Sequence, residues 1–190
     1  MCVRVDAPLC YANAIRRALL TRVDCLAFDY VTIHENTTCM PNELIAHRVG
    51  MIPVIGRGSV HSAVADGEDR TFRNCAVFKL NVERRDADSA DLVCDDACSV
   101  PPAIQIAPMR DTQVLRLTAE ATLNSGLAHG RWNCAVAARC VADDDGFDIR
   151  FESTGAVPRR KMLDDALQGL VESVAAMRRN IVNQVGVVTP

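Results

Sequence analysis

The chain has 190 residues, of which 49% are hydrophobic and 24% are charged, and its formal net charge at pH 7 is −3. This composition is typical of a soluble globular protein with one core or two small ones. It disfavours a stand-alone nucleic-acid-binding protein, because neutralising phosphate groups requires clustered basic residues. No membrane-spanning helix and no secretory signal are expected, because charge interrupts every longer apolar run and the first residues contain no apolar segment.

The first elements expected are a short strand over residues 2–5 and an amphipathic helix. Asn13, Arg16 and Arg17 are spaced i, i+3, i+4 and therefore share one face of that helix. Arginine suits protein interfaces, although a solvated basic face is the alternative for such an Arg-Arg pair. The apolar stripe on a different face consists of Tyr11, Ile15, Ala18 and Leu19.

Residues 26–33 are rich in aromatic and β-branched residues and predict a strand. A helix is predicted next, beginning at Pro41, which is tolerated in a first helical turn, and ending at Gly50. Glu43 lies in its first turn, where a carboxylate favours the helix dipole. His47 has no cysteine, histidine or carboxylate at a convincing ligand spacing, so an interfacial or hydrogen-bonded histidine is predicted.

The middle of the chain predicts strands and loops. Residues 54–73 contain glycines, serines and charges that indicate a loop, and the charged residues 84–96 are predicted to be mostly loop. Alternating apolar residues predict half-buried strands over residues 75–82 and 114–122. Further strands are predicted over residues 134–141 and 147–151, and prolines keep the segment around residues 101–108 extended or irregular.

A long amphipathic helix is predicted over residues 159–182. Its apolar stripe is broader than one small sheet requires, and part of it is therefore assigned to a partner. Asp164 and Asp165 near the start, and Arg178 and Arg179 near the end, favour the helix dipole. The stripe consists of Met162, Leu163, Ala166, Leu167, Leu170, Val171, Val174, Met177 and Ile181.

Between residues 13 and 53, many residues match one known sequence signature at the same spacing. Val49 is a mild departure, because the signature has leucine or isoleucine at that position. The matching residues are Asn13, Ala14, Ile15, Arg16, Arg17, Ala27, Val31, Asn36, Thr38, Asn42, Glu43, Ile45, Ala46, Arg48, Gly50, Ile52 and Pro53. The run resembles the signature of the α-like subunits of DNA-directed RNA polymerases. That family includes the third-largest subunit of eukaryotic RNA polymerase II and its archaeal counterpart.

Two later segments carry the same resemblance. Residues 128–132, AHGRW, resemble the family's E-H-A-K-W segment, and residues 151–155, FESTG, resemble its V-E-S-V-G segment before the last helix. The resemblance therefore covers nearly the whole chain and is thin between residues 54 and 114. An archaeal, a eukaryotic and a virus-encoded enzyme all fit, and the compact, cysteine-rich middle segment slightly favours the virus-encoded one.

The resemblance implies an α+β fold, in which an RNA polymerase α-like dimerisation domain of sheet and helices carries an inserted β-rich domain. Residues 1–53 and 144–190 would form the discontinuous dimerisation domain, and residues 54–143 would form the insert. The strands predicted between residues 75 and 141, away from the helices, agree with this division.

The resemblance also implies a non-catalytic assembly subunit. It would pair with a smaller α-like subunit, and the pair would dock the second-largest and largest subunits, with small accessory subunits in the same complex. DNA would be reached only through the complex, and no membrane would be involved. The expected interface residues are Asn13, Arg16, Arg17, Glu43, His47 and Arg48, with Leu163, Leu167, Leu170 and Val174 on the last helix.

No catalytic residue, cofactor or metal is expected in this chain, and magnesium and zinc are expected in other subunits. Cys94 and Cys98 form a C-x3-C pair, but Cys75 is far away and a zinc site usually combines two close pairs of ligands. Residues 143–146, DDDG, lack the alternating ligands and closing glutamate of a calcium loop, so they predict a solvated turn. No Gly-rich phosphate loop, G-x-S-x-G or H-E-x-x-H motif is present.

Nine cysteines leave one alternative function open. Reduced, mostly buried thiols of an intracellular protein are the default expectation when no secretory signal is visible. The alternative is a free-standing intracellular metal- or redox-sensing protein that uses the cysteines, among which Cys75, Cys94 and Cys98 are the candidates for a redox or metal role. A further alternative, an enzyme whose site residues are scattered along the sequence, is disfavoured by the absence of catalytic motifs. The expected location is intracellular, in nucleus or cytoplasm, or in a virion or viral factory if a virus encodes the chain.

Overall fold

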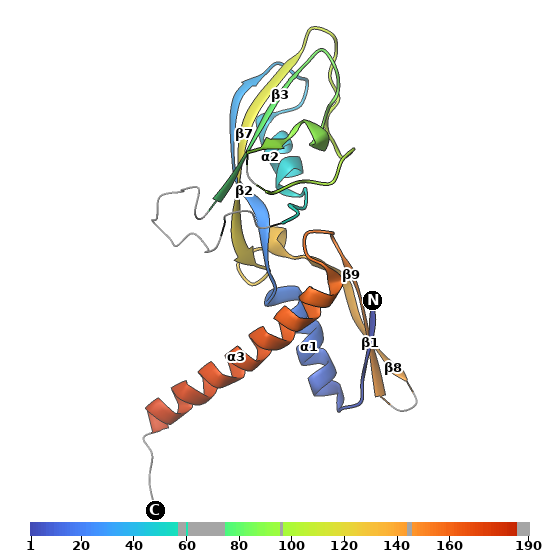
Figure 1. The fold of residues 1–190 in the computed structure, drawn as a ribbon, viewed down its shortest axis with the longest axis vertical. Helices are drawn as coiled ribbons and strands as arrows, with labels where there is room; N and C mark the ends of the chain where they lie inside the picture. Colours follow the sequence, from blue (N-terminus) through green and yellow to red (C-terminus); the bar gives the residue numbers. More distant parts are fainter. Residues whose placement is uncertain (57–59, 61–74, 96, 144–145, 186–190) are drawn as a thin grey trace, which may run out of the picture. The chain divides into compact units, whose positions relative to one another are not determined.

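A computed structural model describes residues 1–56, 60, 75–95, 97–143 and 146–185 (Figure 1). The chain divides into two compact units. The first unit contains Met1–Val23, Ala135–Ser153 and Pro158–Pro190, and the second contains Asp24–Cys134 and Thr154–Val157.

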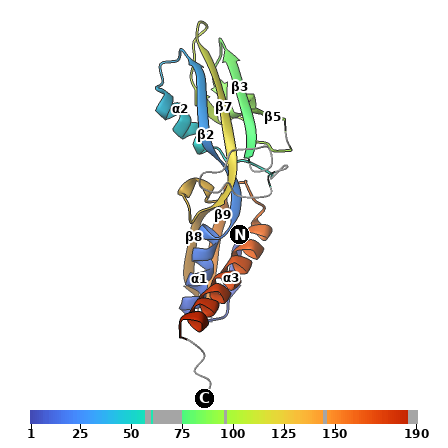
Figure 2. The same ribbon diagram turned by 90° about the vertical axis from the view of Figure 1, so that its left-hand side faces the viewer.

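The first unit combines an antiparallel sheet with two helices. Its sheet has the order β1-β9-β8. Helix α1 contacts β8, β9 and α3, so it links the sheet to the last helix (Figures 1 and 2). The elements are β1 (Cys2–Val5), α1 (Leu9–Thr21), β8 (Ala135–Asp143), β9 (Gly146–Ser153) and α3 (Arg159–Val185). Buried residues of these elements include Ala12, Ala18, Leu19, Ile149, Phe151, Met162 and Ala166.

The crossing of α1 and α3 depends on a glycine. A Cβ atom added at Gly169 would lie 2.9 Å from the Cβ of Arg22 and 3.3 Å from its carbonyl oxygen. Carbon atoms in folded proteins essentially never approach this closely, so a side chain at position 169 would push the helices apart. Glycine inside a helix lowers helix stability by about 1 kcal/mol relative to alanine. Here its missing side chain allows the close approach.

The second unit is built on a four-stranded antiparallel sheet with the order β2-β7-β3-β5, together with a two-stranded sheet of β4 and β6. Helix α2 contacts β2 and β6, and its buried residues join the same core as those of the large sheet (Figure 2). The elements are β2 (Asp24–Asn36), α2 (Asn42–Gly50), β3 (Cys75–Glu83), β4 (Ala87–Asp88), the 3₁₀ turn η1 (Ser89–Asp91), β5 (Val93–Cys94), β6 (Gln105–Ala107), β7 (Val114–Ser125) and the 3₁₀ turn η2 (Gly130–Trp132).

Alternation of apolar residues builds the core of this unit. Phe28 of β2 and Phe78 of β3 meet edge to face, with ring centroids 5.0 Å apart. Ile45 and Val49 of α2 are fully buried against the same cluster. The core-facing residues of the two central strands are Ala76, Phe78, Leu80 and Val82 on β3, and Leu115, Leu117, Ala119 and Ala121 on β7.

A β-bulge interrupts β2. The register against β7 shifts between Phe28 and Tyr30, which places one extra residue, Asp29, in β2. Because side chains alternate along a strand, one extra residue reverses which positions face the core. Phe28 faces the core before the bulge, and the odd-numbered Val31 and Ile33 pack against it after the bulge.

The α+β class and all the long elements predicted from the sequence are confirmed. The structure differs in residues 84–96, where β4, η1 and β5 replace the expected loop. Local capping explains this turn: the Asp88 carboxylate accepts from the Ala90 N–H at 2.8 Å, and the Asp88 N–H donates to the Asp91 carboxylate at 3.0 Å. Burial raises the pKa of Asp91, but hydrogen bonds from Arg85 and the Asp88 N–H lower this pKa more, so its net pKa is below normal.

The predicted core position Tyr11 is instead 61% exposed, because the neighbouring Ala12 is the residue that α1 buries. The expected loop over residues 54–73 lies mostly outside the described residues. The division into residues 1–53 plus 144–190 and residues 54–143 stays a prediction about the family's domain plan. Packing divides the chain after Val23 and Cys134, because β2 pairs with β7 and β8 pairs with β9.

Candidate protein-interaction surfaces

Helix α1 presents the predicted basic face to solvent. Asn13 is exposed, and Arg16 and Arg17 are at least partly accessible. The Arg16 Nε donates to the Asn13 Oδ1 at 3.0 Å, so these two residues share a face. Among the described residues, the Arg17 guanidinium has no hydrogen-bond or ion-pair partner. Because α1 buries Ala18 and Leu19 on its other side, this face can meet a second protein without disturbing the unit.

Helix α3 changes character along its length. Met162 and Ala166 in its first turns are fully buried against its own unit. Of the four predicted interface residues on this helix, Leu163 and Leu170 are half-buried, whereas Leu167 is 38% and Val174 is 60% exposed. The second half continues the apolar stripe in the open, with exposed Val171, Val174, Met177, Ile181 and Val182.

Helix α2 holds the other predicted interface residues, and the structure separates them. Glu43 and His47, four residues apart, are both exposed on one side of α2. Arg48 instead turns toward its own unit, where its Nη2 donates to the carbonyl oxygen of Gln105 at 2.8 Å. This bond ties α2 to β6. Arg48 thus makes a contact within its own unit and Glu43 and His47 are left accessible, and a contact of any of the three with another subunit stays a prediction.

The turn between β2 and α2 explains several motif positions. The Asn36 side chain donates to the Met40 carbonyl oxygen at 2.9 Å and to the Asn42 side chain at 2.7 Å. Its Oδ1 accepts hydrogen bonds from the Thr38 N–H at 3.0 Å and the Thr38 hydroxyl at 2.7 Å. These residues fix the path of the chain into α2, so their part in the motif is structural.

Arg131 stabilises the β2 bulge through hydrogen bonds. Its Nη1 donates to the carbonyl oxygens of Phe28 at 3.2 Å and Asp29 at 3.0 Å, and to the Asp29 carboxylate at 3.2 Å. The guanidinium also lies over the Trp132 ring, 5.4 Å from its centroid. Trp132 is buried and donates its Nε1–H to the Thr122 carbonyl oxygen at 2.9 Å. The motif segment 128–132 thus fastens η2 to both β2 and β7.

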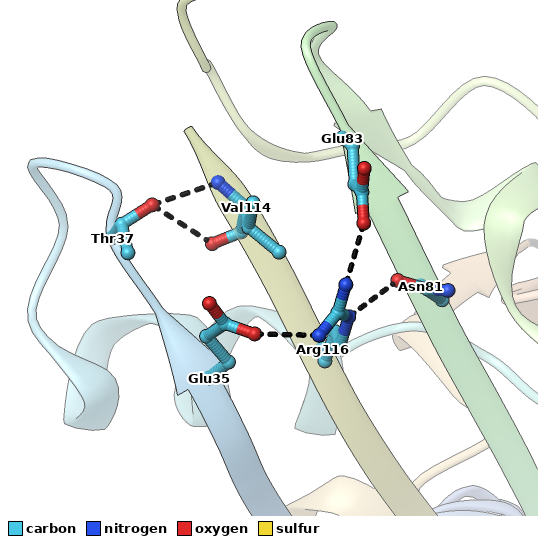
Figure 3. Close-up of polar contacts among 6 residues, drawn as sticks. All are labelled: Glu35, Thr37, Asn81, Glu83, Val114 and Arg116. Atoms are coloured by element: carbon cyan, nitrogen blue, oxygen red, sulfur yellow. Dashed lines mark hydrogen bonds and ion pairs between the residues drawn. The ribbon is translucent and has the colours of Figure 1, made fainter. Parts of the chain in front are cut away.

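The open face of the large sheet carries a polar network around Arg116 (Figure 3). This β7 side chain donates to Glu35 at 2.8 Å, to Glu83 at 2.6 Å and to Asn81 at 3.0 Å. It thereby connects the three neighbouring strands β2, β7 and β3. The side chains of all three charged residues are between 41% and 47% exposed, so water screens the ion pairs and their contribution to stability is small.

The cysteines do not gather into a site in the described part of the chain. Cys75 and Cys98 are buried and Cys94 is half-buried. No group of three or more histidine, cysteine or acidic side chains able to hold a metal ion occurs among the described residues. Asp143 pairs with Arg4 at 3.3 Å, whereas residues 144 and 145 of the acidic turn lie outside the described residues. None of the described helices is long and apolar enough to cross a membrane.

The sequence matches a protein-family model and several known proteins. Residues 6–174 match the model of the RNA polymerase Rpb3/Rpb11 dimerisation domain. The chain is 27% identical to the DNA-directed RNA polymerase subunit Rpo3 of Methanocaldococcus jannaschii over 165 residues, which cover 86% of this chain and 81% of that protein.

Other relatives are similar over a shorter span. Rpo3 of Archaeoglobus fulgidus is 35% identical over 129 residues, covering 64% of this chain and 48% of that protein. The DNA-directed RNA polymerase II subunit rpb3 of Dictyostelium discoideum is 27% identical over 150 residues, covering 69% and 48%. The chain thus spans about half the length of these two relatives. The virus-encoded origin stays a prediction.

Arg131 and Arg116 provide a matched test of which polar contacts stabilise the second unit. Arg131→Met removes the hydrogen bonds of a half-buried guanidinium to two bulge carbonyl groups and to the Asp29 carboxylate, so the free energy of unfolding should fall by about 1–3 kcal/mol. Arg116→Met removes only exposed contacts and should cost less than about 1 kcal/mol. Urea unfolding followed by circular dichroism measures both. An equal loss of unfolding free energy in the two variants would contradict the role of Arg131 in stabilising the bulge.

Proposed function

Because the chain belongs to the RNA polymerase Rpb3/Rpb11 dimerisation-domain family, we propose that it is a non-catalytic assembly subunit of a multisubunit DNA-directed RNA polymerase. It pairs with a smaller α-like subunit, and the pair docks the second-largest and largest subunits. Small accessory subunits complete the complex, and DNA is contacted only through it. The complex works inside the cell, in nucleus or cytoplasm, or in a virion or viral factory if a virus encodes it.

The observation that carries this proposal is the uncovered apolar half of α3. Val174 and Met177 are 60% and 63% exposed, although they continue a stripe whose earlier members Met162 and Ala166 are fully buried. A chain in water gains about 1.5–3 kcal/mol for each large apolar side chain that it fully buries. Contiguous exposed apolar residues on one helix face therefore indicate a surface that another protein covers.

The basic face of α1 supports the second part of the proposal. The Arg17 guanidinium has no partner among the described residues, and Asn13 beside it is exposed. Arginine pairs with carboxylates through a planar fork and is enriched at protein interfaces. We assign this face to the docking of a large subunit. Glu43, His47 and Arg48 of α2 are separate candidates for such a contact.

The test of the α3 assignment uses charge on the exposed stripe. Val174→Asp and Leu167→Asp place a carboxylate where the proposed partner packs, so heterodimer formation should be lost. Both side chains are more than a third exposed in the chain itself, so the variants should still fold. Co-expression with the small α-like subunit, followed by size-exclusion chromatography, measures the outcome.

The controls for this test lie on the same helix. Gln168 and Glu172 hydrogen-bond to each other at 2.8 Å on the exposed surface, so Gln168→Ala and Glu172→Ala should assemble normally. Circular dichroism of each variant checks its fold. Heterodimers of normal affinity with both aspartate variants would rule out this helix as the pairing surface.

The docking assignment predicts a different defect. Arg16→Glu combined with Arg17→Glu should leave the fold and the small-subunit heterodimer intact but prevent recruitment of the second-largest subunit. Breaking one partner of a buried interfacial charge pair typically costs about 2–5 kcal/mol. Co-purification of the complex measures recruitment, and the matched control is Arg159→Glu with Arg160→Glu at exposed positions of α3. Normal recruitment by the α1 variant would return its arginines to a solvated face.

We also propose that this subunit holds no metal of its own, because Cys94 and Cys98 form a single close pair in the sequence and Cys75 is far from it, whereas a zinc site usually combines two close pairs of ligands. Elemental analysis of the purified subunit should then find far less than one zinc or iron per chain. A full equivalent of metal that is lost in a Cys94→Ser, Cys98→Ser variant would show that the cysteines bind it.

A further inference from the structure

The second half of α3 carries a groove in which apolar and basic groups lie together. Val171, Val174, Ala175 and Val182 supply its apolar surface, and Arg178 and Arg179 line it as well. Both arginines are exposed. A protein that covers the apolar surface must therefore also cover, or closely approach, two guanidinium groups.

The helix itself offers these arginines no counter-charge. Between residues 173 and 185 they are the only charged residues, so neither has an acidic residue three or four positions away. The nearest carboxylate on α3 in the sequence, Glu172, accepts a hydrogen bond from Gln168 at 2.8 Å. Among the described residues, neither arginine has a hydrogen-bond or ion-pair partner.

Covering these groups without pairing them is costly. An ion removed from water loses its favourable hydration energy, and only a well-placed opposite charge recovers that energy. The apolar surface favours burial and the arginines oppose it, unless the covering surface brings carboxylates. The groove therefore favours partners that combine apolar surface with carboxylates, and it disfavours partners that are only apolar.

We propose that this groove receives a helix of the smaller α-like subunit whose apolar face carries aspartate or glutamate residues, and that these carboxylates pair with Arg178 and Arg179. The inference rests on the proposed function. It adds that the arginines select the heterodimer over a homodimer. A second copy of this chain would bring two more arginines to the groove, against the single carboxylate of Glu172 on that half of α3.

The experiment measures dissociation constants of the heterodimer at low and high NaCl concentrations by sedimentation. Arg178→Gln with Arg179→Gln should weaken the heterodimer about 10-fold or more and flatten its salt dependence. The same variant should homodimerise more readily than the natural chain. Arg159→Gln with Arg160→Gln, a pair of exposed arginines at the start of the same helix, is the matched control and should leave all three quantities unchanged.

A charge swap tests the pairing directly. Arg178→Glu with Arg179→Glu should prevent binding of the small subunit. Arginine substitutions of the partner's acidic residues, located by cross-linking, should restore binding.

The inference is overturned if the glutamine variant binds with natural affinity and salt dependence while Val174→Asp still abolishes binding; the proposed function then survives. A natural chain that forms no heterodimer overturns both. A natural chain that homodimerises as tightly as it binds the small subunit overturns the selection by charge.

Discussion

The antiparallel pairing of β2 with β7 is the constraint on which the second unit depends. It joins residues 24–36 to residues 115–125 and places the hydrophobic core on one face and a polar network on the other. The bulge at Asp29 belongs to this pairing, because it reverses the alternation of β2 in the middle of the strand. Val31 and Ile33 can pack against the same core as Phe28 only because of that reversal.

A bulge leaves backbone groups outside the regular ladder, and these groups need other partners. Arg131 donates to two carbonyl groups at the bulge although it lies 102 residues along the chain from Asp29, and its neighbour Trp132 fixes η2 to β7. Two motif segments of the family, residues 13–53 and 128–132, thus meet at one structural feature. In this region the motif residues that meet hold the geometry of a strand.

The first unit depends on helix packing. Gly169 allows α3 to approach the end of α1 closely, and Met162 and Ala166 bury the first turns of the helix. Beyond that contact α3 continues without cover from the described residues of its own unit (Figure 1). One helix can in this way hold its own fold together with one half and present apolar surface with the other. The arginines of the second half give this surface a charge preference as well.

The class and the long elements of this protein follow from its amino-acid sequence. The alternation in residues 75–82 and 114–122 and the long stripe of residues 159–182 depend on local spacing, and local spacing is what a sequence displays. The bulge at Asp29 is not among these features, because Tyr30 continues the even-numbered apolar positions of Leu26 and Phe28 in the sequence. The capped turn at residues 88–91 does not follow in the same way, because its two aspartates lie within a charged segment that resembles a loop.

Which arginines are available to another protein is a property of the folded chain. Arg17, Arg48, Arg131 and Arg178 are equivalent in the sequence, where each is a basic residue near apolar neighbours. The fold ties Arg48 to Gln105 and Arg131 to the β2 bulge, and it leaves Arg17 and Arg178 without a partner among the described residues. The difference arises because the acceptors that a guanidinium reaches come from distant parts of the chain. Their positions are set by strand pairing and helix packing, which no local pattern records.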